Sequence, residues 1–168
     1  VLLPPAVPVI RRDDGDDGHA EPFLSRTELY TAAFVSAAAP NAGVSVGRGW
    51  ASVAELNAAL DERIERVLAA MALHGHTHLV LGPIGCGVFR CDPRHVSATF
   101  SRLLMPPHGR FANVFHHVSF SVIGANFGVL RHELSALVDA AARVPLPHAA
   151  AAASTDDGED RSCARQTD

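Results

Sequence analysis

The chain has 168 residues, of which 48% are hydrophobic and 19% charged, and its formal net charge is −4. These values are typical of one soluble globular domain that is large enough to bury a core. No basic excess exists to grip a nucleic-acid backbone, so binding to duplex nucleic acid is not expected. No apolar run is long enough to span a membrane, and the N-terminus does not resemble a signal peptide. Three sparse cysteines favour a reducing, intracellular compartment, the cytoplasm or the nucleus.

The first third of the chain predicts two strands. Residues 7–10 form a short extended apolar stretch, which the charged turn sequence RRDDGDDG follows. Residues 29–39, LYTAAFVSAAA, predict a buried strand that ends in a loop at residues 40–43.

The middle of the chain predicts a long helix and a third strand. Ser52 and Glu55 have the spacing of a capping box, in which each side chain bonds the backbone N–H of the other residue. Gly75 is placed to end the helix, and residues 77–81, THLVL, predict the strand. Apolar residues recur along the helix at Leu56, Leu60, Ile64, Val67, Leu68 and Met71.

The rest of the ordered chain repeats this alternation. Asp92 and Pro93 suit the N-cap and first position of a second helix, which residues 105–107, Met-Pro-Pro, end. Residues 117–123 alternate as a fourth strand, and a last helix follows near Leu130 and Leu134. We therefore expect a domain over residues 1–144 and a disordered, low-complexity tail over residues 145–168.

Strands that alternate with helices predict an α/β fold, with a mostly parallel sheet covered on both faces. In such sheets ligands bind beyond the carboxyl ends of the strands. Three loops fall there, at residues 40–43, 82–89 and 124–127.

The second of these loops has the composition of an anion cradle. Gly82, Gly85 and Gly87 let backbone N–H groups converge, and the next helix adds its positive dipole end. Such a cradle suits a phosphate or a diphosphate. The alternative is a strand–helix turn that is merely rich in glycine, and spacing alone does not identify the anion.

Known phosphate motifs do not fit this loop. A Walker loop needs a lysine that is absent here, and the Rossmann pattern is interrupted by Arg90. The acidic residue that a Rossmann site needs for its ribose is also missing, since no Asp or Glu lies between Asp92 and Glu133. The spacing of Cys86 and Arg90 does not match a thiolate phosphatase.

Two other candidate sites are weaker. His74, His76 and His78 alternate along the chain, but strand alternation separates them and no cysteine pair supports a zinc site, so we expect no metal. Cys86 could be a reactive thiol beside a helix N-terminus, although a small buried side chain is the simpler interpretation.

Four segments, in order, resemble the microbial-type poly(ADP-ribose) glycohydrolases. LVLGPIGCGVFRCDPRHVSATFSRLL and GRFANVFHHVSFSVIG resemble the C-terminal half of that family, with its G-C-G-x-F signature. Upstream, AVPVIRRDDG and SAAAPNAG resemble two further family segments. The similarity covers approximately residues 1–142, the C-terminal portion of the family pattern.

This resemblance implies a macrodomain-like, three-layer α/β/α fold that binds ADP-ribose or poly(ADP-ribose) on modified proteins, without a cofactor. Residues of the glycine loop would wrap the diphosphate, with Phe89 over the ribose whose bond is cut. Asn126 and Phe127 would meet the adenosine half, and Asn41 would border the pocket. The implied ligand-binding residues are Gly85, Cys86, Gly87, Val88, Phe89, Asn126 and Phe127.

The chain departs from the family at its catalytic signature. The family's glycine triplet and its Gln-Glu-Glu sequence, which supplies the general acid–base chemistry, are both absent here. We therefore expect no catalytic residue in this chain, missing N-terminal elements in its sheet, and no hydrolysis by these residues alone. In the first interpretation, the chain is part of a glycosidase, and the complete protein would hydrolyse the ribose O-glycosidic bond. The alternative is a non-catalytic or degenerate ADP-ribose-binding fragment.

Overall fold

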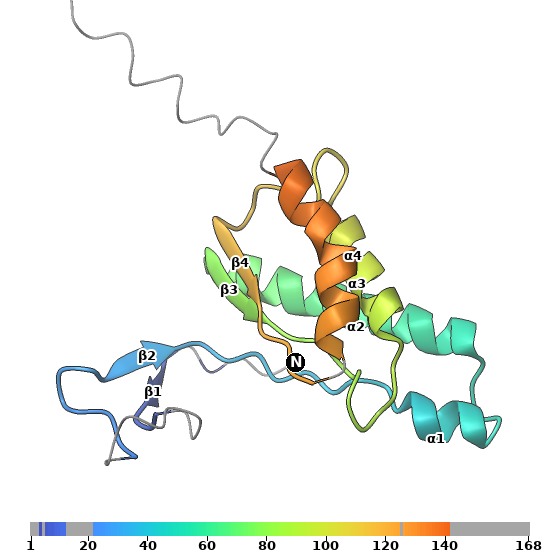
Figure 1. Cartoon of the computed structure of the whole chain (residues 1–168), viewed down its shortest axis with the longest axis horizontal. Coiled ribbons are helices and arrows are strands. Elements are labelled where there is room, and N and C mark those ends of the chain that lie inside the picture. The colour runs from blue at the N-terminus through green and yellow to red at the C-terminus, as the bar shows by residue number, and fades with distance from the viewer. Residues whose placement is uncertain (1–3, 5, 13–21, 125, 142–168) are drawn as a thin grey trace, which may run out of the picture.

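The computed structural model describes residues 4, 6–12, 22–124 and 126–141 (Figure 1). The predicted tail at residues 145–168 lies outside them. None of the helices in this part of the chain is both long and apolar enough to cross a membrane. The elements in chain order are β1 (Val7–Val9), β2 (Tyr30–Ala32), α1 (Ala42–Gly47), α2 (Val53–Leu73), β3 (His78–Leu81), α3 (Pro93–Leu104), β4 (His117–Phe120) and α4 (Asn126–Ala141).

The strands form two small sheets. β1 and β2 pair antiparallel, with Val7 opposite Ala32, and Figure 1 shows this hairpin set apart from the helical body. β3 and β4 pair parallel, with His78 opposite His117. The α/β class is confirmed, but the described residues do not form the single, mostly parallel sheet that the sequence predicts.

The predicted strand at residues 29–39 is wrong in its length. Only Tyr30–Ala32 belong to β2, because its partner β1 is itself three residues long. A strand extends only as far as a neighbour accepts and donates its backbone hydrogen bonds. Residues 33–39 therefore run on toward α1 outside the named strands, with a single β-bridge position at Ser36, despite their apolar composition.

The first long helix begins and ends where the sequence predicts. The Ser52 hydroxyl accepts a bond from the Glu55 N–H at 3.2 Å, and the Glu55 carboxylate accepts from the Ser52 N–H at 2.8 Å. Behind the C-cap His74, Gly75 has a φ of 74°, a conformation that glycine adopts at little cost. Both ends of α2 therefore lie where the sequence predicts them.

The second long helix is fixed at its start and along its side. The Asp92 side chain accepts from the Arg94 N–H at 2.9 Å, directly before Pro93. Further along, His95 Nε2 lies 2.8 Å from Asp61 Oδ1 on α2. The Thr99 hydroxyl donates to the same oxygen at 2.5 Å, so Asp61 ties α3 to α2.

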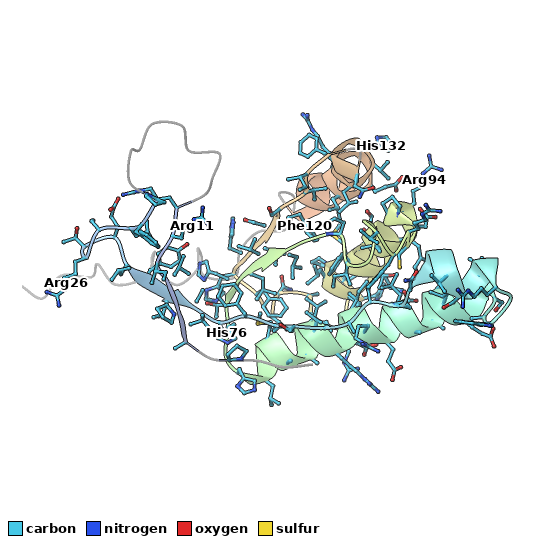
Figure 2. The ribbon with its side chains drawn as sticks, turned by 90° about the horizontal axis from the view of Figure 1, so that it is seen from below. Arg11, Arg26, His76, Arg94, Phe120 and His132 are labelled. Carbon is cyan, nitrogen blue, oxygen red and sulfur yellow. The ribbon has the colours of Figure 1, made fainter. Side chains whose placement is uncertain are left out.

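The core lies between the helices and one face of the β3–β4 sheet. Leu79 and Leu81 are buried, whereas Val80 between them is 76% exposed on the other face. Phe100 of α3 meets Phe120 of β4 with ring centroids 5.2 Å apart, and Figure 2 shows Phe120 in the interior. The described residues thus make two layers, one of helices and one of strands, and not the predicted three.

Candidate functional site

The glycine loop at residues 82–92 connects β3 to α3. Gly85 has a φ of 77°, and a Cβ there would lie 2.7 Å from Cys91 Sγ and 2.9 Å from Ala39 Cβ. Only glycine fits that position. Gly87 has no positive φ, and a Cβ there would meet nothing within 4 Å. Gly87 is therefore required neither by packing nor by backbone conformation.

The three predicted loops do meet. The Gly43 N–H donates to the Phe89 carbonyl at 3.1 Å, and Cys91 Sγ donates to the Pro40 carbonyl at 3.3 Å. From the third loop, Asn126 Nδ2 donates to the Cys86 carbonyl at 3.2 Å. The prediction that these loops share one end of the fold is confirmed by these bonds.

Some amides of the glycine loop are used within the loop. The Cys86 N–H donates to the Pro83 carbonyl at 3.0 Å, so this amide does not take part in an anion cradle. The Arg90 N–H donates to the Gly87 carbonyl and the Cys91 N–H to the Gly85 carbonyl, both at 3.0 Å. These bonds close the loop and hold its shape.

Three successive backbone amides of the loop make no hydrogen bond within the described part of the chain. Within the described part of the chain, the N–H groups of Gly87, Val88 and Phe89 have no hydrogen-bond acceptor. Val88 is 91% exposed and Phe89 39% exposed, so the segment faces solvent. Successive backbone amides of this kind form an anion-binding concavity without any charged side chain. The segment at residues 87–89 is therefore the feature of the loop most suited to a phosphate.

The two cysteines of the loop are poor nucleophiles. The pKa of Cys86 is raised to about 11, mainly by burial and to a smaller extent by the neighbouring Cys91 and Asp92. Burial also raises the pKa of Cys91. Because the thiolate is the reactive form, both residues act as small buried side chains near neutral pH, which agrees with the simpler interpretation of Cys86.

The raised Cys86 pKa predicts a loss of stability in alkali. The folded state holds the thiol proton to a higher pH than the unfolded chain, whose thiol titrates near its ordinary pKa of 9.0. The contribution is complete below pH 9 and is lost as pH rises toward about 11. Urea unfolding at pH 8 to 10.5 should show a falling free energy of unfolding, with a smaller fall in Cys86→Ala. Equal slopes in the two proteins would contradict this assignment.

The three loops contain a single carboxylate. Asp92 is the only carboxylate in residues 40–43, 82–92 and 124–127, and its side chain caps α3. A capping carboxylate serves the helix N-terminus rather than a substrate oxygen. That the chain itself supplies no catalytic residue stays a prediction.

The remaining predicted residues lie in different places. Asn41 accepts from the Val44 N–H at 3.1 Å and caps α1, a helix that the sequence analysis missed although an N-cap asparagine signalled it. Asn126 reaches the glycine loop, as described above. Phe127 is 51% exposed and lines a hollow between β4 and α4 that no glycine-loop residue shares.

A cavity of about 310 Å³ lies beside the loop, between α1 and α2. Its polar lining comes from Asn57, Arg90 and Asp92, and the rest is apolar. None of the predicted ligand-binding residues lines it. Sequence reasoning missed this cavity because α1, which forms one of its walls, was not predicted.

His78, His116 and His117 lie at or next to the N-terminal ends of β3 and β4, whereas the glycine loop follows the C-terminal end of β3. The ring of His78 lies 6.1 Å from that of His116 and 6.2 Å from that of His117. In the part of the chain that the structure describes, no group of three or more potential ligands could hold a metal ion.

Comparisons with known proteins find relatives among solved structures. No protein-family model and no curated protein matches the sequence. A poly(ADP-ribose) glycohydrolase from Deinococcus radiodurans, crystallised with ADP-ribose, is 36% identical with a TM-score of 0.68, over 80% of this chain and 52% of that one. The poly(ADP-ribose) glycohydrolase from Thermomonospora curvata is 39% identical with a TM-score of 0.65, over 82% of this chain and 45% of that one. The chain thus spans about half the length of these relatives.

Proposed function

This chain belongs to the microbial-type poly(ADP-ribose) glycohydrolase family, and we propose that its glycine loop binds the diphosphate of ADP-ribose, free or within poly(ADP-ribose) on modified proteins. In the complete family fold the ligand's ribose O-glycosidic bond would be hydrolysed. Because the family's Gln-Glu-Glu sequence is absent from this chain, the proposal assigns the chemical step to none of its residues.

One observation carries this proposal: the three successive amides of Gly87, Val88 and Phe89 lack acceptors in the described chain. A diphosphate has several anionic oxygens, and backbone amides bind them without the desolvation cost of a buried cation. The ADP-ribose complex of the Deinococcus relative supports this choice of anion. Gly85 and Cys86 serve the same site by holding the loop in shape.

Neighbouring side chains would contact the remaining parts of the ligand, the ribose and the adenosine half. Phe89, partly exposed at the end of the amide run, is suited to lie against a ribose. Asn126 is bonded to the Cys86 carbonyl, so it orients the loop from the side proposed for the adenosine half. Phe127, which offers half of its surface to solvent, would contact the base.

The completed fold would be a three-layer macrodomain. The described residues supply one helical layer and the β3–β4 pair. Parallel sheets are normally covered on both faces, and the exposed Val80 lies on the bare face of this one. Further strands and a second helical layer would cover that face.

A substitution at Gly87 tests the proposal by calorimetric titration with ADP-ribose. Gly87→Asp places a carboxylate beside the amide run in open space, so it should weaken binding by about tenfold or more through charge repulsion. Gly47→Asp is the control, because a side chain there also meets nothing within 4 Å and the charge change is identical. Equal affinities of the two variants, or no binding by the unaltered chain, would overturn the proposal.

A second candidate function is ADP-ribose binding without catalysis in any context. It is favoured by the single carboxylate of the three loops, which is committed to capping α3. Under either proposal, the chain alone should release no ADP-ribose from poly(ADP-ribose). Release after the unmatched half of a relative is added would favour the glycosidase, and binding without release would favour the second candidate.

A further inference from the structure

The cavity of about 310 Å³ between α1 and α2 has the composition of a small-ligand site. Ligand pockets in proteins are typically about 300–1,000 Å³ in volume, with mostly apolar walls and a few polar groups. The polar residues here are Asn57, Arg90 and Asp92. Within the described ranges, the side chains of Asn57 and Arg90 make no hydrogen bond or ion pair, so both are available to a ligand. The apolar walls include Val46, Val53, Leu56 and Leu60.

The backbone at Arg90 is unusual for a residue with a side chain. Its φ is 56°, a left-handed conformation that a Cβ disfavours and that is typical of functional sites. The Arg90 side chain crosses Gly43 of α1 so closely that a Cβ on Gly43 would lie 3.1 Å from Arg90 Cδ. The absence of a side chain at Gly43 therefore lets Arg90 lie against α1, where it lines the cavity.

The cavity adjoins one end of the proposed diphosphate segment. Asn126 bonds the Cys86 carbonyl before the segment begins. At its other end, the N–H of Gly43, which lines the cavity, donates to the Phe89 carbonyl at 3.1 Å, and Figure 1 shows α1 beside the start of α2. If the adenosine half lies toward Asn126 and the ribose whose bond is cut lies at Phe89, the cavity is the next space beyond that ribose. In poly(ADP-ribose), the O-glycosidic bond of that ribose leads to the adenosine of the neighbouring unit.

We propose that the cavity between α1 and α2 binds the adenosine of this neighbouring unit, with Arg90 paired to its phosphates. The inference rests on the proposed function and deepens it, because it makes the polymer the preferred ligand over a single ADP-ribose group.

The chemistry of the lining matches an adenine nucleotide. A guanidinium pairs with phosphate oxygens through two parallel hydrogen bonds. The Asn57 amide both donates and accepts, as the edge of adenine does. Asp92 accepts from the Arg94 N–H through one carboxylate oxygen, and its other oxygen can accept from the amino group of the base. The apolar walls would cover the ring.

Calorimetric titration of the full 168-residue chain with ADP-ribose and with a purified linear dimer of ADP-ribose tests this site. The dimer should bind at least about tenfold more tightly, because its second unit adds a charge-assisted hydrogen bond and a buried base. Arg90→Gln should lower the affinity for the dimer by about tenfold and change that for ADP-ribose by less than about twofold. Arg94→Gln is the matched control: it removes the same charge from an exposed residue that does not line the cavity and that Figure 2 shows at the periphery of the molecule.

Asn57→Ala tests the cavity without altering the strained loop. Position 57 lies in α2 and is only partly buried, and alanine favours a helix, so the variant should fold. It should lower the affinity for the dimer by about threefold to tenfold and leave ADP-ribose binding unchanged. In the unaltered chain, the side-chain amide resonances of Asn57 should shift on addition of the dimer and stay in place on addition of ADP-ribose.

The outcomes separate this inference from the proposed function. Equal affinities for the dimer and for ADP-ribose, equal effects of the two glutamine substitutions, an equal loss of both ligands in Arg90→Gln, or unmoved Asn57 resonances with the dimer bound would each overturn the inference alone. Absence of binding of either ligand would overturn the proposed function, and the inference with it.

Discussion

Gly85→Ala is expected to lower the free energy of unfolding by about 2–5 kcal/mol. The new Cβ would lie 2.7 Å from Cys91 Sγ and 2.9 Å from Ala39 Cβ, and the backbone would have to keep a φ of 77°. A non-glycine residue in that region costs roughly 1–2 kcal/mol, and overpacking adds about 1–3 kcal/mol. Urea unfolding followed by circular dichroism measures the loss.

Gly87→Ala is the matched control for this prediction. It makes the same chemical change two residues away, where a Cβ meets nothing within 4 Å and φ is not positive. Its free energy of unfolding should stay within about 0.5 kcal/mol of the unaltered chain. Similar losses in the two variants would mean that the loop is not packed against Cys91 and Ala39 as described.

Phe100→Ala is expected to cost about 3–5 kcal/mol of stability. Phe100 is fully buried on α3, and its ring meets Phe120 edge-on at 5.2 Å. Its removal leaves a cavity where the helical layer joins the sheet, and it also removes an aromatic pair. Since a domain has only about 5–15 kcal/mol of stability in total, the variant should be close to unfolding.

Phe100→Leu keeps this prediction measurable if the alanine variant does not fold. Leucine fills part of the space and should lose clearly less stability, again by urea unfolding. A matched truncation at the exposed end of α2, Leu73→Ala, should cost less than about 0.5 kcal/mol, because Leu73 is 85% exposed. A loss from Phe100→Ala as small as that from Leu73→Ala would contradict the described core.

Local signals in the sequence predicted the boundaries of the two long helices α2 and α3, but α1 was missed. The capping box of Ser52 and Glu55 and the glycine at position 75 gave the start and end of α2. Asp92 and Pro93 gave the start of α3. These features work because a helix satisfies its own hydrogen bonds, so that its boundaries depend on neighbouring residues.

The strands could not be predicted to the same degree. Residues 29–39 have the composition of a strand, yet only three of them pair, because pairing depends on partners far away in the sequence. Residues 117–123 likewise shorten to His117–Phe120, the length over which β3 supplies a neighbour. The predicted third layer also requires elements that the described residues do not contain.

The meeting of the three loops was predicted from the sequence, but the details of their contacts were not. Topology brings the three loops together, and the Asn126 bond to the Cys86 carbonyl agrees with that. The internal bond of the Cys86 N–H could not be foreseen, because it depends on a tight turn back to Pro83. Because the Cys86 N–H is used in this bond, the candidate anion-binding amides are those of Gly87, Val88 and Phe89.

The most direct test of the account follows the backbone amides of the chain by nuclear magnetic resonance during titration with ADP-ribose. The N–H resonances of Gly87, Val88 and Phe89 should shift most and together, and that of Cys86, which bonds Pro83, should shift less. Adenosine, which lacks the diphosphate, should not reproduce the shifts. Saturable binding that leaves these three amides unmoved, or no binding at all, would contradict the claim that this loop holds a diphosphate through its main chain.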